Sequence, residues 1–202
     1  MKKILLSVCT IVMLVSCNNK NEKKVLVLNR GNATVDVATK KVIIKEGSGN
    51  EEHEMLYNTS DKIVIDVNNN NTTFQASIPE NGYYIINALN DTIIGSLQNY
   101  IDPSKPATDG VFISQEMIQK SIDSLTALTE GKNISEANHN FFIPPFTTVK
   151  ITTNTKAIII APYHNIRSLE QDGDKIPEVY RFFSINEIKE KIEKQKALTK
   201  KN

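Results

Sequence analysis

The sequence has 202 residues, of which 40% are hydrophobic and 23% are charged. This composition excludes a disordered tail, a collagen-like repeat and a protein that crosses a membrane many times. The 24 basic side chains nearly balance the 23 acidic ones, which argues against nucleic-acid binding because phosphate contacts need a basic surplus.

The N-terminus has the pattern of a secretory signal peptide. Lys2 and Lys3 give it a positive start, and residues 4–15 are mostly apolar. A transmembrane helix needs about 20 apolar residues, whereas polar residues begin here at Asn18. Residues 1–16 are therefore predicted to be a signal peptide that is removed from the mature protein.

The end of this signal resembles the lipobox of bacterial lipoproteins, through the residues Leu14-Val15-Ser16-Cys17. The resemblance implies that the Cys17 thiol receives diacylglycerol, that the chain is cut just before Cys17, and that the new amine is acylated. Two or three acyl chains hold a protein firmly on a membrane, whereas one chain alone is marginal. Cys17 is thus the predicted lipidation site, and the membrane is a predicted partner through that lipid.

The residues after Cys17 indicate where such a lipoprotein goes. Asn18 stands where Asp is associated with retention in the inner membrane, and residues 18–24 lack the acidic run that resembles surface-export signals of Bacteroidota lipoproteins. We expect a Bacteroidota-like cell envelope and an outer-membrane anchor that faces the periplasm. Residues 17–24 are polar and are predicted to form a flexible tether.

Both cysteines lie in the first 17 residues, so the mature domain beyond Cys17 has no thiol. This excludes internal disulfides, cysteine-ligated metals and cysteine nucleophiles from that domain.

The first half of the mature domain reads as a series of short strands. Alternation of apolar and polar residues is clearest at Phe74, Ala76 and Ile78. Residues 46–52 are rich in Gly, Ser and Glu and are predicted to be a loop. Short turns at 68–71, 79–82 and 90–91 are expected to join the last four strands into an antiparallel meander. The predicted strands are residues 25–28, 34–37, 42–44, 63–67, 74–78, 83–89 and 92–97.

The second half mixes helices with strands. Ser114 can cap a helix over residues 114–130, with Gly131 just past its end, and a long loop is expected from there to residue 146. Ser184 and Glu187 fit a capping box that opens a second helix over residues 185–199. Further strands are predicted near residues 149–151, 157–161 and 179–183.

About nine strands and two helices predict a mainly β fold of the α+β class. The expected architecture is an antiparallel β-sandwich-like domain with two appended helices. Residues 25–202 are long enough to form one domain with its own core.

Motifs that would indicate an enzyme are absent from the sequence. It has no Gly-x-Ser-x-Gly, His-Glu-x-x-His or Gly-rich phosphate loop. His53, His139 and His164 have no partner at metal-ligand spacing, although a triad can assemble from residues distant in sequence. We predict a non-enzymatic protein with no catalytic residue and no cofactor.

One acidic segment resembles the Asp-Gly-Asp-x-Ile-Pro stretches of calcium-binding repeats in secreted bacterial proteins. Asp172, Asp174 and Glu178 supply hard oxygen ligands near a Gly turn. The segment occurs once, and Lys175 stands where a small or acidic residue is usual. A plain polar loop is therefore favoured, and these three residues are kept only as weak calcium candidates.

The most apolar of the predicted loops holds the candidate partner-binding residues. Its prolines stiffen an extended segment, which lowers the entropy cost of docking. The segment can serve as an exposed recognition surface, or it can fold back and plug one end of the sandwich. Two adjacent Phe side chains point to opposite sides, so only one of Phe141 and Phe142 is expected to face the core. The residues are Phe141, Phe142, Pro144, Pro145 and Phe146.

These features predict a lipid-anchored cell-envelope protein that binds or helps to assemble another envelope component. The alternative is a lipoprotein that binds a small ligand or a glycan. An exposed hydrophobic patch at residues 142–146 would favour the first function. A concave pocket with a few convergent polar groups would favour the second.

Overall fold

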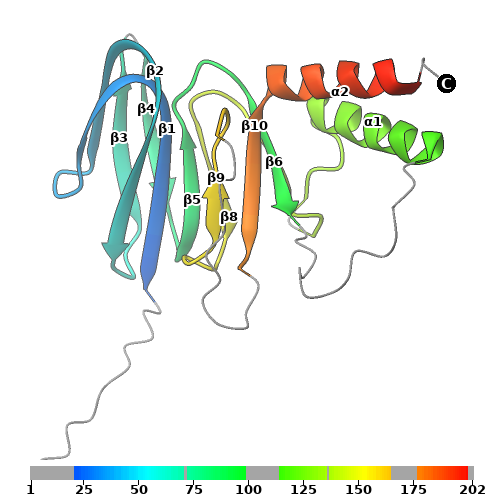
Figure 1. Cartoon of the computed structure of the whole chain (residues 1–202). Coiled ribbons are helices and arrows are strands. Elements are labelled where there is room, and N and C mark those ends of the chain that lie inside the picture. Colours follow the sequence, from blue (N-terminus) through cyan, green and yellow to red (C-terminus); the bar gives the residue numbers. More distant parts are fainter. Residues whose placement is uncertain (1–20, 71, 99–113, 136, 165–176, 200–202) are drawn as a thin grey trace, which may run out of the picture.

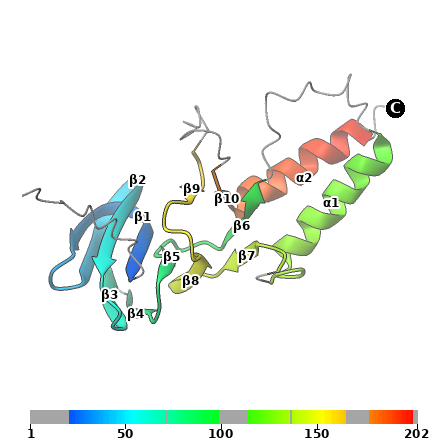
Figure 2. The ribbon, with the colours of Figure 1, turned by 90° about the horizontal axis from the view of Figure 1, so that it is seen from below.

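The computed structural model describes residues 21–70, 72–98, 114–135, 137–164 and 177–199. These residues form ten β-strands and two helices, which confirms the prediction of a mainly β fold with two helices. The elements lie in three layers: a curled six-stranded sheet, a four-stranded sheet and a pair of helices (Figures 1 and 2).

The six-stranded sheet has the strand order β4-β3-β2-β1-β5-β8. Its pairing is mixed, because β1 runs parallel to β5 and β2 runs parallel to β3. The sheet curls until its edge strands β4 and β8 meet. The six strands are β1 (Glu22–Asp36), β2 (Lys41–Asn58), β3 (Ile63–Asn69), β4 (Thr72–Ile78), β5 (Gly82–Asn87) and β8 (Thr147–Thr152).

The four-stranded sheet has the order β7-β6-β10-β9, with β9 parallel to β10. The expected purely antiparallel pairing is therefore wrong in both sheets. The four strands are β6 (Ile93–Gln98), β7 (Asn140–Ile143), β9 (Ile158–Ile160) and β10 (Val179–Ser184).

The predicted meander over residues 63–97 is also wrong. Only β3 and β4 pair as expected. β5 pairs with β1 and β8 rather than with β4, and the turn at 90–91 leads from one sheet to the other. Every residue of β5 is buried, so this strand needs a central place in the sheet, and that need outweighs the local turn signal.

β1 and β2 are longer than predicted, because one bulge replaces the expected loop at 46–52. The register of the pair shifts between Arg30 and Asn32, where Gly31 has a φ of 99°. A Cβ at Gly31 would overlap the backbone of Lys45, so glycine permits this close approach. β1 therefore continues through the bulge as one bent strand.

The predicted tether ends earlier than expected. Residues 22–24 begin β1 and pair with residues 56–58 of β2. Lys23 is buried, and its ammonium donates to the Thr59 carbonyl at 2.9 Å and to Asn81 Oδ1 at 3.3 Å. Both acceptors lie far from Lys23 in the sequence. The polar residues around Lys23 therefore do not indicate that its side chain is buried.

The structure contains three hydrophobic cores. The first core lies inside the curled sheet, and the second lies between the two sheets. Successive strand residues point to opposite faces, so Val25 and Val27 enter the first core while Leu26 and Leu28 enter the second. Residues 25–28 of β1 are therefore apolar without alternation, because both faces of this part of the strand are buried.

The helices α1 (Gln115–Thr129) and α2 (Ile185–Thr199) agree with the prediction. Ser114 Oγ accepts from the Met117 N–H at 3.2 Å. The capping box also forms: Glu187 Oε2 accepts from the Ser184 N–H at 2.7 Å, and Ser184 Oγ accepts from the Glu187 N–H at 3.1 Å. The helices bury their apolar stripes in the third core, against the outer face of the four-stranded sheet (Figure 2).

Candidate functional site

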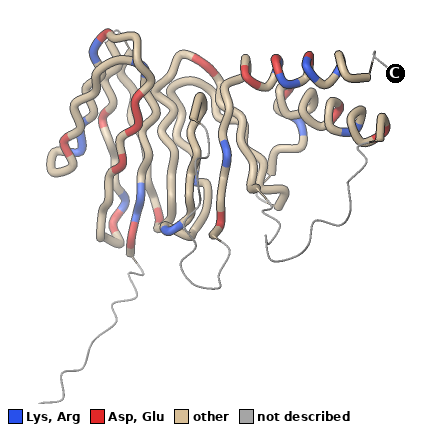
Figure 3. The backbone as a smooth tube through the Cα atoms, viewed as in Figure 1, with Lys and Arg blue, Asp and Glu red and all other residues tan. Residues whose placement is uncertain are grey.

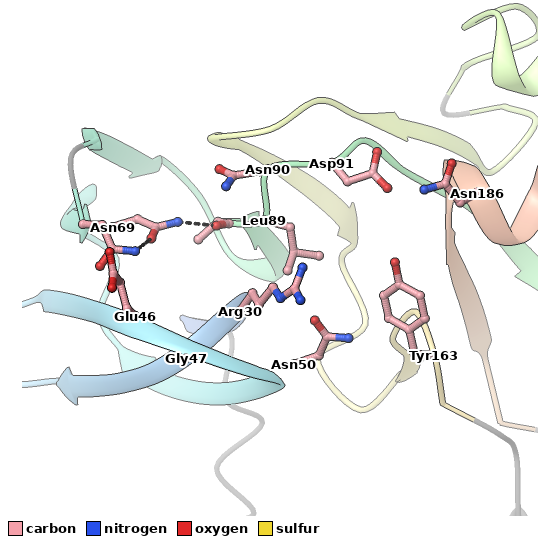
Figure 4. Close-up of a pocket in the computed structure, with 12 residues that line it drawn as sticks. Arg30, Glu46, Gly47, Asn50, Asn69, Leu89, Asn90, Asp91, Tyr163 and Asn186 are labelled. Carbon is pink, nitrogen blue, oxygen red and sulfur yellow. Dashed lines mark hydrogen bonds between the residues drawn. The ribbon is translucent and has the colours of Figure 1, made fainter.

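A pocket of about 680 Å³ lies at the end of the curled sheet where β1 and β2 bulge (Figure 4). This volume is within the range of small-molecule sites. Its residues come from the bulge, the end of β3, the link between β5 and β6, the turn after β9 and the first turn of α2. They are Arg30, Glu46, Gly47, Asn50, Asn69, Asn70, Ala88, Leu89, Asn90, Asp91, Tyr163 and Asn186.

Asparagine is the commonest residue in this lining. Asn69 is held in place, because its Nδ2 donates to the Ala88 carbonyl at 2.6 Å and its Oδ1 accepts from Asn70 at 3.3 Å (Figure 4). The exposed side chains of Asn50, Asn90 and Asn186 form no hydrogen bond with another described residue. Three amides from three separate segments are therefore available to a ligand.

Tyr163 stands beside the pocket, and the residue as a whole is 53% exposed (Figure 4). Its φ of 68° is unusual for a bulky residue. Its N–H donates to Glu187 Oε1 at 3.1 Å, and the next residue, His164, lies 2.9 Å from Glu52 Oε1. Glu187 of α2 and Glu52 of β2 thus hold this turn in place.

The charges around the pocket are mixed. Among the described lining residues, Arg30 is the one basic side chain, and Glu46 and Asp91 are the acids. Over the described part of the chain, Lys and Arg are interspersed with Asp and Glu (Figure 3). The described part of the pocket lining therefore carries no basic excess that would concentrate a polyanion.

Asn87 fixes the link between β5 and β6 that forms one wall of the pocket. The Asn87 side chain is fully buried. Its Nδ2 donates to the carbonyls of Asp91 at 2.9 Å, Ile143 at 3.0 Å and Pro144 at 3.1 Å. Its Oδ1 accepts from the Leu89 N–H at 3.1 Å. The Asn87 amide thus joins the β5–β6 link to the β7–β8 link.

The two adjacent phenylalanines lie in a strand, which corrects the expected loop up to residue 146. Phe141 and Phe142 are in β7, which pairs with β6. Phe141 is buried in the second core, 5.7 Å from the Tyr180 ring between centroids. Phe142 points to the opposite side, as predicted, but that side is covered by the third core. Both rings therefore pack inside the protein.

The rest of the Phe-Pro segment is more exposed. Phe146 is half-buried and packs edge-on against Phe74 of β4, with 5.8 Å between ring centroids. It thus helps to close the curled sheet. Pro145 is half-buried and Pro144 is exposed. Pro144 is the member of the predicted set whose side chain the structure leaves at the surface.

Of the remaining predicted site residues, the structure describes Glu178. Cys17, Asp172 and Asp174 lie outside the described residues. Glu178 accepts from the Tyr180 hydroxyl at 2.6 Å and from Thr152 Oγ1 at 2.8 Å, while its second oxygen accepts from Asn154 at 2.8 Å. Within the described ranges, no three His, Cys, Asp or Glu side chains are grouped to hold a metal.

A second cluster surrounds Tyr180 at a smaller cavity of about 360 Å³. The Tyr180 hydroxyl lies 3.5 Å from His139 Nδ1 as well as beside Glu178. Burial, helped by the bond to Glu178, raises the pKa of Tyr180 to about 12. The hydroxyl therefore stays protonated at neutral pH and acts as a donor that joins β10 to Glu178 rather than as a base.

We expect Glu178 to make the fold sensitive to acid. Burial alone would raise the pKa of Glu178, but hydrogen bonds from Tyr180, Asn154 and Thr152 outweigh it and lower that pKa below 4.5. The stabilisation is thus complete above about pH 4.5 and is lost as the pH falls through the lowered pKa. The melting temperature of Glu178→Gln should lie a few degrees below that of the unchanged protein at pH 7, and the gap should narrow by pH 3. A gap that stays constant with pH would contradict this account.

In the part of the chain that the structure describes, no helix is both long and apolar enough to cross a membrane. No protein-family model matches the sequence, and no curated protein or solved structure is significantly similar to it.

Proposed function

We propose that this chain is a lipid-anchored cell-envelope protein that binds a small polar ligand without catalysis. The lipobox ending at Cys17 supports the anchor, and the residues after Cys17 support the periplasmic face of the outer membrane. The pocket lined by Arg30, Asn50 and Tyr163 is the observation that carries the binding role, because it is concave and polar groups converge on it.

The position of the pocket suits an anchored protein. β1 begins shortly after Cys17 and reaches Arg30 at the pocket. At about 3.3 Å per residue, the stretch from Glu22 to Arg30 spans roughly 26 Å. The start of β1 lies at one end of the sheet, whereas the β5–β6 link and the start of α2, which supply lining residues, lie at the opposite end (Figure 1). A lipid on Cys17 would thus place the pocket on the side away from the membrane.

The asparagines of the lining support a binding role. Amide side chains do not ionise, so the asparagines can orient a ligand but cannot exchange protons with it. The scaffold in this proposal is sandwich-like, since the second core lies between two sheets. Rigid sheets hold the lining residues from several segments in fixed positions.

Binding of a protein partner through the Phe-Pro segment is the other function that the sequence predicts. Phe141 and Phe142 pack in the second and third cores, so two of the aromatic anchors for such a surface are engaged within the protein. Exposure of Pro144 leaves a small contact area. We therefore favour the pocket.

Filling the pocket should abolish ligand binding. Asn50 is exposed on β2 and lines the pocket, so Asn50→Trp should occupy the cavity without disturbing the core. Native mass spectrometry of the protein purified from its own envelopes should show a small-molecule adduct that Asn50→Trp lacks. Asn58→Trp makes the same change on an exposed residue at the C-terminal end of β2, away from the pocket, and should keep the adduct. Loss from both variants, or from neither, would contradict the assignment of this pocket.

Cys17→Ala should block lipidation and maturation, because the acyl acceptor is removed. Metabolic labelling with a radioactive fatty acid should mark the unchanged protein but not the variant. Cys9→Ala is the matched control, since Cys9 lies within the predicted signal and should leave labelling unchanged. Equal label in Cys17→Ala and the unchanged protein would refute the lipoprotein prediction.

A further inference from the structure

We infer that the ligand of this pocket is a carbohydrate, held by stacking on Tyr163 and by hydrogen bonds to the free amides of Asn50, Asn90 and Asn186. This inference rests on the proposed function and adds the chemical class of the ligand. It follows from the lining residues, their fixed and free hydrogen-bonding groups, and the balance of charge.

The free amides suit a ligand that is rich in hydroxyl groups. An amide side chain carries two N–H donors and a carbonyl acceptor. A hydroxyl group also donates and accepts, so it can satisfy either end of an amide. Asn50, Asn90 and Asn186 come from β2, from the β5–β6 link and from α2. They can therefore meet hydroxyls on different sides of one sugar ring.

Tyr163 supplies a fixed flat surface. Its backbone is held by the bond from its N–H to Glu187 and by the pair of His164 with Glu52. Tyrosine combines a large apolar face with a polar tip, which matches the apolar C–H face and polar rim of a pyranose. A bulky residue in the left-handed region of the backbone costs free energy, and a residue that is 53% exposed gains only part of the packing that would offset this cost. A ligand contact would explain why the ring is held there.

A buried acceptor lies next to the same turn. Asn29 is 1% exposed, and its Oδ1 has no hydrogen-bond partner, whereas its Nδ2 donates to the Gly31 carbonyl at 2.8 Å. Asn29 lines a small cavity of about 10 Å³ that shares Asn50, Leu89 and Tyr163 with the pocket. That volume is about one water-sized sphere, so it suits a single hydroxyl donor rather than a ring or a chain.

The charges and the polarity exclude other ligand classes. Among the described lining residues, one arginine against two acids gives no basic surplus for a polyphosphate or a nucleotide. Small apolar contacts from Ala88 and Leu89 are too few to hold an acyl chain. A neutral or weakly charged saccharide needs neither a basic surplus nor a large apolar surface, so it fits this lining.

The test uses the full-length protein in lauryldimethylamine oxide, a detergent without a sugar headgroup. One probe set contains glucose, galactose, mannose, N-acetylglucosamine and their short oligomers. The other contains amino acids, dipeptides and nucleotides. Melting-temperature shifts select the probes that bind, and calorimetry then gives their dissociation constants.

We expect at least one saccharide to bind. Tyr163→Ala should weaken it by roughly tenfold or more, whereas Tyr163→Phe keeps the ring and should stay within about threefold. Asn50→Ala should weaken it about three- to tenfold through a lost hydrogen bond. Asn58→Ala, which removes an exposed amide far from the pocket, should bind as the unchanged protein does. These residues are exposed, so all four variants should keep their melting temperatures.

The outcomes separate the two proposals. If an amino acid, dipeptide or nucleotide binds in a way that depends on Tyr163 or Asn50 and no saccharide does, the carbohydrate inference is wrong and the binding function stands. If a saccharide binds but none of the pocket variants weakens it, the assignment of the site is wrong. If neither probe set binds, both proposals are overturned.

Discussion

Asn87→Asp is expected to destabilise the protein by roughly 5 kcal/mol at neutral pH, although the two side chains have almost the same shape. The Asn87 amide donates to three backbone carbonyls in a fully buried site. A carboxylate there has no proton to donate and would face those carbonyl oxygens with a negative charge. Asn87→Ala lacks the charge but still leaves the carbonyls without a donor, at about 3 kcal/mol.

The effect of pH distinguishes the charge from a packing defect. Burial among acceptors would raise the pKa of the new carboxyl above its unfolded value of about 3.9. Its penalty would therefore grow as the pH rises above about 4 and fade below it. Denaturant unfolding of Asn87→Asp and the unchanged protein, compared at pH 7 and pH 4, should show the difference shrinking in acid. The deficit of Asn87→Ala should change little.

Asn90→Asp is the matched control for this experiment. It makes the same change three residues along, on an exposed side chain that forms no hydrogen bond with another described residue. Its stability should stay within about 0.5 kcal/mol of the unchanged protein. Similar losses at both positions would show that Asn87 has no special role in joining the two links.

The elements that local patterns define are those that the sequence predicts well. Ser114, Ser184 and Glu187 cap the helices as expected, because a cap depends on residues three positions apart. The alternating residues Ile63 and Ile65 point into the first core for a similar reason. Such features need no knowledge of the rest of the fold.

Strand order depends on distant segments, and here local signals mislead. The Gly-rich run at 46–52 looks like a loop, yet residues 50–52 pair with β1 and the pairing resumes at Lys45. The turn at 79–82 looks like a hairpin, yet β5 leaves β4 and joins β1. The unbroken apolar runs at residues 25–28 of β1 and 83–86 of β5 are a usable signal, because a strand segment that is buried on both faces belongs in the middle of a sheet.

The candidate pocket was missed for a related reason. Asn69, Asn70 and Asn90 follow or join strands, so in the sequence they indicate turns. Only the strand order shows that these turns meet at one end of the sheet, beside Tyr163 and Asn186. Asn87 lies in an apolar strand, and nothing nearby in the sequence reveals the carbonyls that its side chain satisfies.

Phe141→Ala is the second substitution with a large expected effect. The ring is 6% exposed and contacts both Tyr180 and Phe182 in the second core. Removing a buried phenylalanine ring costs about 3–5 kcal/mol, which for a domain of this size should lower the melting temperature by roughly 10 °C. Phe141→Leu keeps most of the apolar volume and should recover more than half of the loss. Thermal unfolding followed by circular dichroism measures both.

The same series of variants tests what the Phe-Pro segment does. Phe142 and Phe146 are half-buried, against the helices and against Phe74 respectively, so Phe142→Ala and Phe146→Ala should each cost less than Phe141→Ala. Pro144→Ala changes an exposed side chain and should leave the melting temperature within about 2 °C. If the segment serves the fold alone, Pro144→Ala should also keep every protein that co-purifies with the unchanged chain in mild detergent. A partner that is lost from Pro144→Ala at unchanged stability would instead show a recognition surface, because only an exposed contact can be removed without loosening the core that Phe141 fills.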